Sequence, residues 1–339
     1  MKIYENNIFV HLVFEGHLIH HWSSSSESLT NNTMQTILGS TGVIGTELAK
    51  NLVQYTDKIR LVSRDPKLVN PNDELITADL MEPRQVVNAI KDSEVVYLTA
   101  GLKYDHVVWE DQWPVIMQNV LDACRKHHSK LVFFDNVYAY GKVDGWMTEE
   151  TPYKEQSKKG IIRIGISNML LEDVRRGNIE GMIVRSADFY GPDLKNSFIN
   201  VMVIENLKKG KKAQLMISDK FKHSLTYTPD AGKATALLGN TPSAFNQVWH
   251  LPTDKNVLTG KEFVALAASA MNVIPKTTIL PKWMVWMAGL TNGIIRETME
   301  MLYQFDSDYL FDSSKFDKAF TFRTTTYEEG IKATVDAMK

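Results

Sequence analysis

Three glycines at intervals of three residues follow a short apolar segment near the start of the chain. The segment 35–38 predicts a strand, and residues 46–55 repeat apolar side chains at helical spacing. Gly39 permits a tight turn, Gly42 lets the backbone approach a pyrophosphate, and Gly45 lets the helix pack closely on the strand, while the helix N-terminus attracts the anion. The turn therefore predicts dinucleotide binding, and the alternative is a purely structural turn. The contacts expected here are Gly39, Ser40, Thr41, Gly42, Val43, Ile44 and Gly45.

The end of the second expected strand, 59–62, bears on the choice of dinucleotide. An acidic residue at this point usually accepts hydrogen bonds from the ribose hydroxyls and repels a 2′-phosphate. The residues here are Ser63, Arg64 and Asp65, and a guanidinium binds a phosphate as a bidentate fork. We therefore predict NADP(H) as the cofactor in preference to NAD(H). Asp65 leaves an alternative open, because it can bind the ribose or neutralise Arg64.

The glycine turn belongs to the first of several strand–helix units. Further strands and helices are expected at 75–77, 82–91, 94–99, 113–126 and 131–134. Repeated units of this kind predict an α/β fold with a doubly wound parallel sheet and helices on both faces. Ligands bind beyond the carboxyl ends of such strands. The segments 99–104, 135–141 and 186–192 are therefore expected to line the site.

Four motifs, taken in order, resemble the short-chain dehydrogenase/reductase superfamily. They are Gly39-x-x-Gly42-x-x-Gly45, Ala78-Asp79-Leu80, Val137-Tyr138-Ala139-Tyr140-Gly141 and Arg185-x-x-x-Phe189-Tyr190-Gly191-Pro192. Over about residues 34–335 the order is similar to that of the extended branch, the NAD-dependent epimerase/dehydratase family. The resemblance implies a Rossmann-type sheet with a smaller C-terminal substrate-binding lobe, with Asp79 near the adenine and Tyr190 near the nicotinamide. The further cofactor contacts expected are Arg64, Leu80, Thr99, Ala100 and Gly101.

The chain departs from the family at the residues that transfer the proton. Extended members use a Tyr-x-x-x-Lys pair, in which the lysine lowers the pKa of the tyrosine. The matching positions here are Ile164 and Asn168, and neither side chain is titratable. Asn136 stands where the family has a serine or threonine. Hydride transfer between an alcohol and a ketone therefore needs a different proton donor in this chain.

Four residues are candidates for the missing catalytic groups. Tyr138 occupies the position at which dehydratase members of the family carry a carboxylate, so it is the first candidate for proton donor. Tyr104 and His223 are further candidates. Asn136 can orient a carbonyl or hydroxyl group, because its amide both donates and accepts hydrogen bonds. The alternatives are structural, namely packing for the tyrosines and a surface position for the histidine.

The leading hypothesis is an NADP(H)-binding oxidoreductase or epimerase/dehydratase-like enzyme that acts on a small carbonyl- or hydroxyl-bearing metabolite. Arg163 and Arg185 can bind an anionic group of the substrate, although Arg185 is equally suited to an internal ion pair. The replacements at Ile164 and Asn168 also support a different class of function. In this alternative the protein is a non-catalytic NADP(H)-binding sensor or scaffold.

Composition limits the partners and the location of the protein. The 339 residues include 38 basic and 40 acidic ones, so the charge of -2 gives no basic excess for nucleic acid. The sequence contains no run of about 18 apolar residues that would suggest a membrane span, and we expect no membrane partner. The single cysteine, Cys124, excludes an intrachain disulfide and favours the cytoplasm. The partners expected are a small-molecule substrate and, by analogy with the family, a second copy in a homodimer.

The expected organisation has three parts. Residues 1–33 form a poorly ordered extension whose histidines lack carboxylate or cysteine partners, so no metal site is expected. Residues 34–190 form the dinucleotide-binding domain, which is completed by a return segment near 220–251. Residues 191–219 and 252–339 form the substrate-binding lobe.

Overall fold

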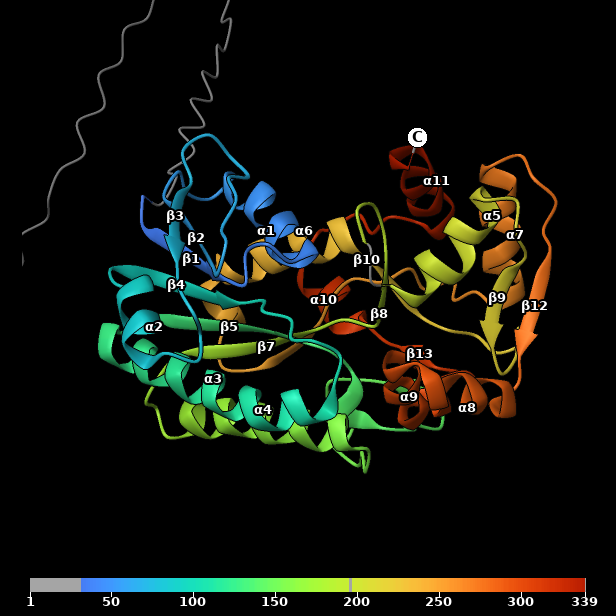
Figure 1. Ribbon diagram of the computed structural model, residues 1–339. Coiled ribbons are helices and arrows are strands. Elements are labelled where there is room, and N and C mark those ends of the chain that lie inside the picture. Colours follow the sequence, from blue (N-terminus) through green and yellow to red (C-terminus); the bar gives the residue numbers. More distant parts are fainter. Residues whose placement is uncertain (1–31, 195–196, 339) are drawn as a thin grey trace, which may run out of the picture.

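A seven-stranded parallel sheet forms the centre of the protein (Figure 1). The computed structural model describes residues 32–194 and 197–338. The strands are β1 (Met34–Leu38), β2 (Ile59–Ser63), β3 (Glu74–Thr77), β4 (Ser93–Leu98), β5 (Lys130–Asp135), β7 (Gly181–Arg185) and β11 (Val248–His250). Their order across the sheet is β11-β7-β5-β4-β1-β2-β3, and every pair is parallel. The chain therefore winds outward from β1 in both directions, which confirms the predicted α/β fold.

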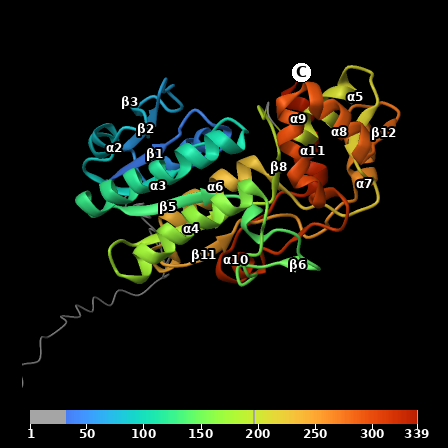
Figure 2. The same ribbon diagram turned by 60° about the horizontal axis from the view of Figure 1, so that its bottom comes forward.

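Helices cover both faces of this sheet (Figures 1 and 2). The helices on one face are α1 (Val43–Leu52) and α6 (Thr228–Gly239), and those on the other are α2 (Pro83–Ala89), α3 (His106–His127) and α4 (Lys158–Arg175). α1 and α6 pack closely because Gly232 has no side chain, since a Cβ there would lie 2.6 Å from the backbone carbonyl carbon of Glu47. The strands between the two layers are apolar on both sides, as is typical of buried parallel sheets.

The helix expected at 113–126 begins earlier, at His106. The carboxylate of Asp105 accepts a hydrogen bond from the backbone N–H of Val107 and so caps the first turn. Trp109 is buried in that added stretch, and its contacts with the core stabilise it. The helix ends where His128 adopts a left-handed conformation with φ of 55°.

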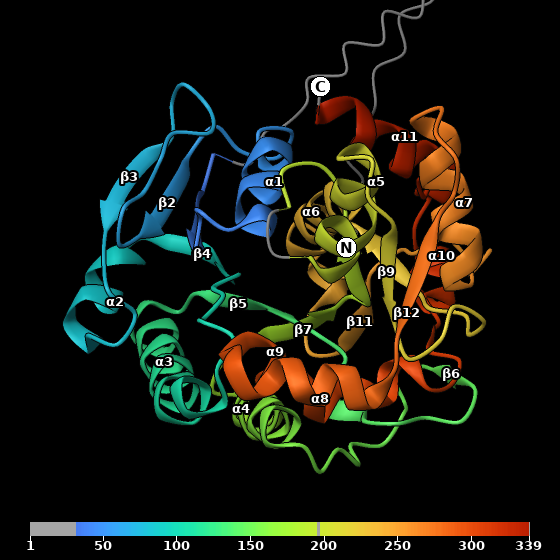
Figure 3. The ribbon, with the colours of Figure 1, turned by 45° about the vertical axis from the view of Figure 1, so that its right-hand side comes forward.

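A smaller lobe packs beside the central domain (Figure 3). Its elements include β9 (Ala213–Met216), β12 (Thr277–Leu280), α5 (Asn206–Lys208), α7 (Gly260–Ala270) and α11 (Tyr327–Ala337). The chain continues from β12 through α8 (Lys282–Thr291), α9 (Gly293–Thr298) and η4 (Met299–Phe305). The remaining short elements are η1 (Tyr138–Tyr140), β6 (Trp146–Met147), β8 (Asp188–Tyr190), η2 (Asn200–Glu205), β10 (Leu225–Tyr227), η3 (Pro242–Ala244), β13 (Leu310–Phe311) and α10 (Ser314–Ala319). No helix in the described part of the chain is long and apolar enough to cross a bilayer.

Two segments bear on the expected domain boundaries. β11 comes from the return segment near 220–251 and pairs with β7 at the edge of the sheet. α10 also returns to the central domain, where Phe316 packs against Trp249. Part of the range 252–339 therefore packs on the central domain instead of the lobe. The expected extension at 1–33 lies outside the described residues, apart from its last two positions.

Candidate functional site

In the glycine turn between β1 and α1, two of the three glycines pack tightly against the backbone and the third is exposed. Gly39 has φ of +92°, and a Cβ there would lie 2.4 Å from the Cα of Ala100, just beyond β4. A Cβ at Gly45 would lie 2.8 Å from the carbonyl oxygen of Gly39. Gly42 differs, because a Cβ there would meet nothing closer than 3.4 Å and the residue is exposed. The turn therefore has the room for a ligand that its spacing predicts.

The donors of this turn fit the pyrophosphate of a dinucleotide. The hydroxyl of Ser40 is buried and has no hydrogen-bond partner among the described residues, whereas Thr41 is exposed. Gly42 is the N-cap of α1 and provides no side-chain cap, so the positive end of the helix keeps donors for an anion. Val43 is half-buried and Ile44 is buried against the sheet. These donors have no hydrogen-bond partner within the described protein, so an anion bound in the cradle could accept hydrogen bonds from them.

Arg64 is exposed after the carboxyl end of β2 and forms no ion pair with any described residue. Asp65 pairs with Lys67 instead, with 2.9 Å between the ammonium nitrogen and the carboxylate. The hydroxyl of Ser63 accepts a hydrogen bond from the backbone N–H of Asp65. In this structure Asp65 therefore does not neutralise Arg64, and the guanidinium remains available to a phosphate.

The other expected cofactor contacts fall into two groups. Five of them follow β3 and β4 at the carboxyl edge of the sheet, namely Asp79, Leu80, Thr99, Ala100 and Gly101. Tyr190 is different, because only 1% of it is exposed and its ring packs among Tyr227, Phe263 and Tyr327 in the core of the lobe. Contact between that ring and a nicotinamide stays a prediction.

Two of the candidate proton donors, Tyr104 and Tyr138, meet at the carboxyl edge of the sheet, in the loops after β4 and β5. The ring of Tyr138 stacks on Trp109 with centroids 6.4 Å apart, and Tyr104 meets the same indole edge-on at 5.9 Å. The two phenols therefore share one aromatic neighbour and influence each other's pKa. The side-chain oxygen of Asn136 accepts a hydrogen bond from the backbone N–H of Tyr138 at 3.0 Å. Asn136 therefore holds the loop that carries the phenol.

His223 approaches the same place from the side of the lobe. Its Nε2 lies 2.9 Å from Oδ2 of Asp188 on β8, and its ring stacks on Phe305 with centroids 5.2 Å apart. The negative charge of Asp188 contributes to raising the pKa of both Tyr104 and Tyr138. The fold thus brings three candidates from separate loops into one electrostatic environment.

The two phenols are difficult to ionise. Burial is the largest cause, and it raises the pKa of Tyr138 well above its ordinary value, with a further rise from the neighbouring Tyr104. Burial also raises the pKa of Tyr104, although its interaction with Tyr138 offsets part of the rise. Both groups are therefore protonated at neutral pH, so each carries a proton that it can donate, while the raised pKa makes the phenolate that remains costly to form.

A buried charge network lies beneath the loop of Tyr138. The carboxylate of Asp135 lies 3.1 Å from Nε of Arg163 and 3.1 Å from Nε of Arg185. Arg185 has no exposed surface, so it forms the internal ion pair and is not open to a substrate. Arg163 packs over the ring of Trp113, and its buried Nη1 has no hydrogen-bond partner among the described residues.

The inner face of α4 presents a pair of cations. Lys159, Arg163 and Ser167 recur every four residues and are buried on this face. Ile164, at the family's tyrosine position, is half-buried, and Asn168, at its lysine position, is exposed. Comparison with the family motif overlooked Lys159, and the four-residue spacing from Arg163 was the available signal.

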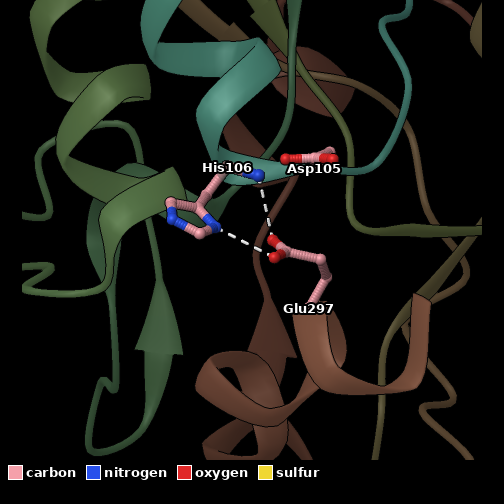
Figure 4. A group of neighbouring side chains, drawn as sticks. All are labelled: Asp105, His106 and Glu297. Atoms are coloured by element: carbon pink, nitrogen blue, oxygen red, sulfur yellow. Dashed lines mark hydrogen bonds and ion pairs between the residues drawn. The ribbon is translucent and has the colours of Figure 1, made fainter. Parts of the chain in front are cut away.

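Lys159 connects the central domain to α9 and η4. Its ammonium lies 2.7 Å from the carboxylate of Glu297, 2.6 Å from that of Glu300 and 4.7 Å from the ring centre of Tyr104. Glu297 also accepts a hydrogen bond from the backbone N–H of His106 and lies 2.9 Å from its ring (Figure 4).

The residues Asp105, His106 and Glu297 are near enough to one another to hold a metal ion (Figure 4). The ammonium of Lys159 already balances the charge of Glu297, and a cation bound there would face it at close range. His106 and Glu297 are therefore better described as part of an ion-pair joint between the central domain and the smaller lobe. This joint consists of Lys159, Glu297, Glu300 and His106.

A doubly wound parallel sheet with this glycine cradle defines the Rossmann-type class of dinucleotide-binding proteins. The chain belongs to the NAD dependent epimerase/dehydratase family, whose sequence model matches residues 35–250. The matched range ends with β11, the last strand of the central sheet. A comparison with curated proteins finds no match to the chain.

Several solved structures share the architecture at low sequence identity. The UDP-glucose 4-epimerase of Thermus thermophilus, in complex with NAD, is 18% identical with a TM-score of 0.73, and the match covers 90% of this chain and 98% of that one. The dTDP-glucose 4,6-dehydratase of Bacillus anthracis, also with NAD, is 17% identical with a TM-score of 0.74 and coverage of 90% and 96%. The UDP-N-acetylglucosamine 4-epimerase of Methanobrevibacter ruminantium M1 is 15% identical with a TM-score of 0.74 and coverage of 91% and 98%. These likenesses establish the fold.

Proposed function

We propose that the protein is an NADP(H)-dependent oxidoreductase that reduces the carbonyl group of a small metabolite, with Tyr138 as the proton donor. The observation that carries the proposal is the meeting of two phenols, Tyr104 and Tyr138, on the ring of Trp109 at the carboxyl edge of the sheet, the edge that also carries the glycine cradle. The cofactor, when bound, supplies the hydride. The chain itself must then supply a proton to the carbonyl oxygen, and Ile164 and Asn168 have none to give.

Tyr138 donates its hydroxyl proton to the oxygen of the carbonyl as that oxygen becomes negative. The C=O group gains a hydride at carbon and a proton at oxygen, and Tyr138 is left as a phenolate. The guanidinium of Arg163 acts electrostatically on this phenolate and stabilises it. Tyr104, the neighbouring phenol, returns a proton to Tyr138 and recovers its own from solvent. Asn136 positions the loop but does not carry the proton.

Arg64 supports the choice of NADP(H). It stands exposed after β2, where its fork can bind a 2′-phosphate, and Asp65 is engaged by Lys67. Two of the three solved structures described above contain NAD, so the two dinucleotides must be compared directly. Calorimetric titration with both is the test, and tighter binding of NAD(H) would overturn the preference.

The proton donor is tested by Tyr138→Phe in a carbonyl-reduction screen with NADPH. We expect kcat to fall by about 100-fold or more, the usual contribution of a general acid, with binding of NADPH unchanged. Tyr55→Phe is the matched control, because this phenol lies after α1, away from the cluster, and its loss should leave kcat unchanged. An unchanged kcat in Tyr138→Phe would remove this residue from the mechanism.

A second candidate is a non-catalytic NADP(H)-binding sensor. It is favoured by one observation, namely that the family's catalytic positions on α4 carry Ile164 and Asn168. Binding of NADP(H) without turnover of any compound in a broad carbonyl and sugar-nucleotide panel would support the sensor. Turnover that depends on Tyr138 would exclude it.

A further inference from the structure

The outer face of α8 and α9 carries an apolar stripe. We define it as Trp283, Trp286, Met287, Leu290 and Ile294, whose exposed fractions are 62%, 53%, 55%, 63% and 67%. The first four occupy positions i, i+3, i+4 and i+7 of α8 and so share one side of the helix. Val285 and Gly289 are buried on the opposite side. Figure 3 shows α8 and α9 at the front of the molecule, with no other element drawn over them.

α9 folds back against α8, so both helices hold the stripe in place. A Cβ at Gly289 would lie 3.3 Å from the Cα of Arg296, which shows how closely the two helices approach. Val285 belongs to a buried cluster with Met216 and Leu302. The stripe is therefore a fixed surface and does not depend on partial unfolding of the lobe.

Charge in this segment is divided between the inner and the outer side. Residues 263–296 contain no aspartate or glutamate. The first two carboxylates that follow, Glu297 and Glu300, point inward to Lys159. Lys282 and Arg296 border the stripe, and Lys282 shares the single carboxylate of Asp306 with Lys142. The outer side of α8 is thus apolar, with one cation, Lys282, at the start of α8 and another, Arg296, on α9.

We propose that this stripe docks the protein on an anionic lipid surface. Trp283 and Trp286 have the amphipathic rings that favour the boundary between water and lipid, and Lys282 and Arg296 match anionic headgroups. A second copy on this face would set these cations against those of its partner, with no carboxylate on the stripe to compensate. Charge therefore favours lipid over self-association.

The proposal departs from the expectation that no membrane partner exists. That expectation rested on the lack of an apolar run long enough to span a bilayer. A helix of ten residues that lies in the interface plane needs no such run, because only its outer face enters the lipid. The two criteria address different modes of attachment.

The test is co-sedimentation of the full chain with vesicles. One set contains phosphatidylcholine alone, and the other has a quarter of its lipid replaced by phosphatidylglycerol. We expect binding to the anionic set that weakens from about 100 mM to about 500 mM salt, because headgroup attraction is screened. Trp286→Ser with Leu290→Ser should weaken binding by about tenfold or more. Lys282→Gln with Arg296→Gln should remove most of the preference for the anionic set.

Ile274→Ser is the matched control, since this isoleucine is 72% exposed but lies before β12, outside the stripe. It should bind vesicles as the unchanged protein does, and thermal unfolding monitored by circular dichroism should show that all variants are folded. Failure of the unchanged protein to bind anionic vesicles overturns the proposal, as does equal weakening by Ile274→Ser. A dimer in sedimentation velocity that the Trp286 and Leu290 changes dissociate, without vesicle binding, would identify a second copy as the occupant.

Discussion

Replacing Lys159 with methionine should weaken the joint between the two lobes. The lysine side chain has no exposed surface, while the side chains of Glu297 and Glu300 are 12% and 23% exposed. Removal of one partner from a fully buried pair costs about 3–5 kcal/mol, because a charge is left without compensation. The residual solvent contact of the two carboxylates reduces this, so we expect Lys159→Met to lower the free energy of unfolding by about 2–3 kcal/mol.

Urea denaturation at pH 7 measures this change. The matched control is Lys50→Met, which breaks a lysine–glutamate pair of similar length, 2.7 Å to Glu47, but with the lysine side chain 49% exposed. Lys50→Met should lower the free energy of unfolding by at most about 0.5 kcal/mol. Adding Glu297→Gln and Glu300→Gln to Lys159→Met should recover part of the stability, because the orphaned charges are gone. A change below about 0.5 kcal/mol in Lys159→Met would refute the reasoning.

Acid pH gives an independent check on the same joint. Burial raises the pKa of Glu297, but hydrogen bonds from Lys159 and His106 outweigh it and lower the pKa to about 2. The folded pKa is below the ordinary value of 4.5, so this group stabilises the fold above pH 4.5 and the contribution is lost between pH 4.5 and about 2. Lys159→Met should show a shallower loss of stability across that window.

Three further predictions concern the cradle, the cofactor and a buried histidine. Gly39→Ala forces a Cβ onto Ala100 at positive φ, and should abolish dinucleotide binding in calorimetry and cost about 2–4 kcal/mol of stability, while Gly165→Ala, on the exposed side of α4, meets no atom within 4 Å and should be neutral. Arg64→Gln should weaken NADP(H) binding by about tenfold and leave NAD(H) binding unchanged, and an equal loss for both would contradict the assignment. Burial lowers the pKa of His250 to about 3, so unfolding should become easier as pH falls from 6.5 toward 3, with a slope of up to about 1.4 kcal/mol per pH unit in urea titrations.

The fold was predictable because its signals are local. The turn from Gly39 to Gly45 fixes where β1 ends and α1 begins, and alternating strands and helices then determine a parallel sheet. Periodicity places the start of α3 too late, although the capping residue Asp105 and the buried Trp109 are both present in the sequence. Boundaries depend on caps and packing, which periodicity alone does not register.

The contacts of the site were only partly predictable. Topology places the loops of Tyr104 and Tyr138 at the same edge of the sheet, so their proximity follows from the strand order. The partners of Lys159 did not follow, because Glu297 lies 138 residues away in a segment whose path depends on the packing of the lobe. The pairing of His223 with Asp188 is likewise a product of tertiary structure.

The proposed proton transfer assigns the two roles of the family's usual pair to residues of different elements. The phenol of Tyr138 comes from the loop after β5 and the cation of Arg163 from the inner face of α4, so the two parts of the couple belong to different elements. Arg163 also shares the carboxylate of Asp135 with Arg185, which offsets part of its positive field at the phenol. Burial then prevails and raises the pKa of Tyr138. Tyr138 therefore keeps its proton at neutral pH, which is the state that a donor to a carbonyl oxygen needs, and the phenolate left after donation would depend on Arg163 for stabilisation.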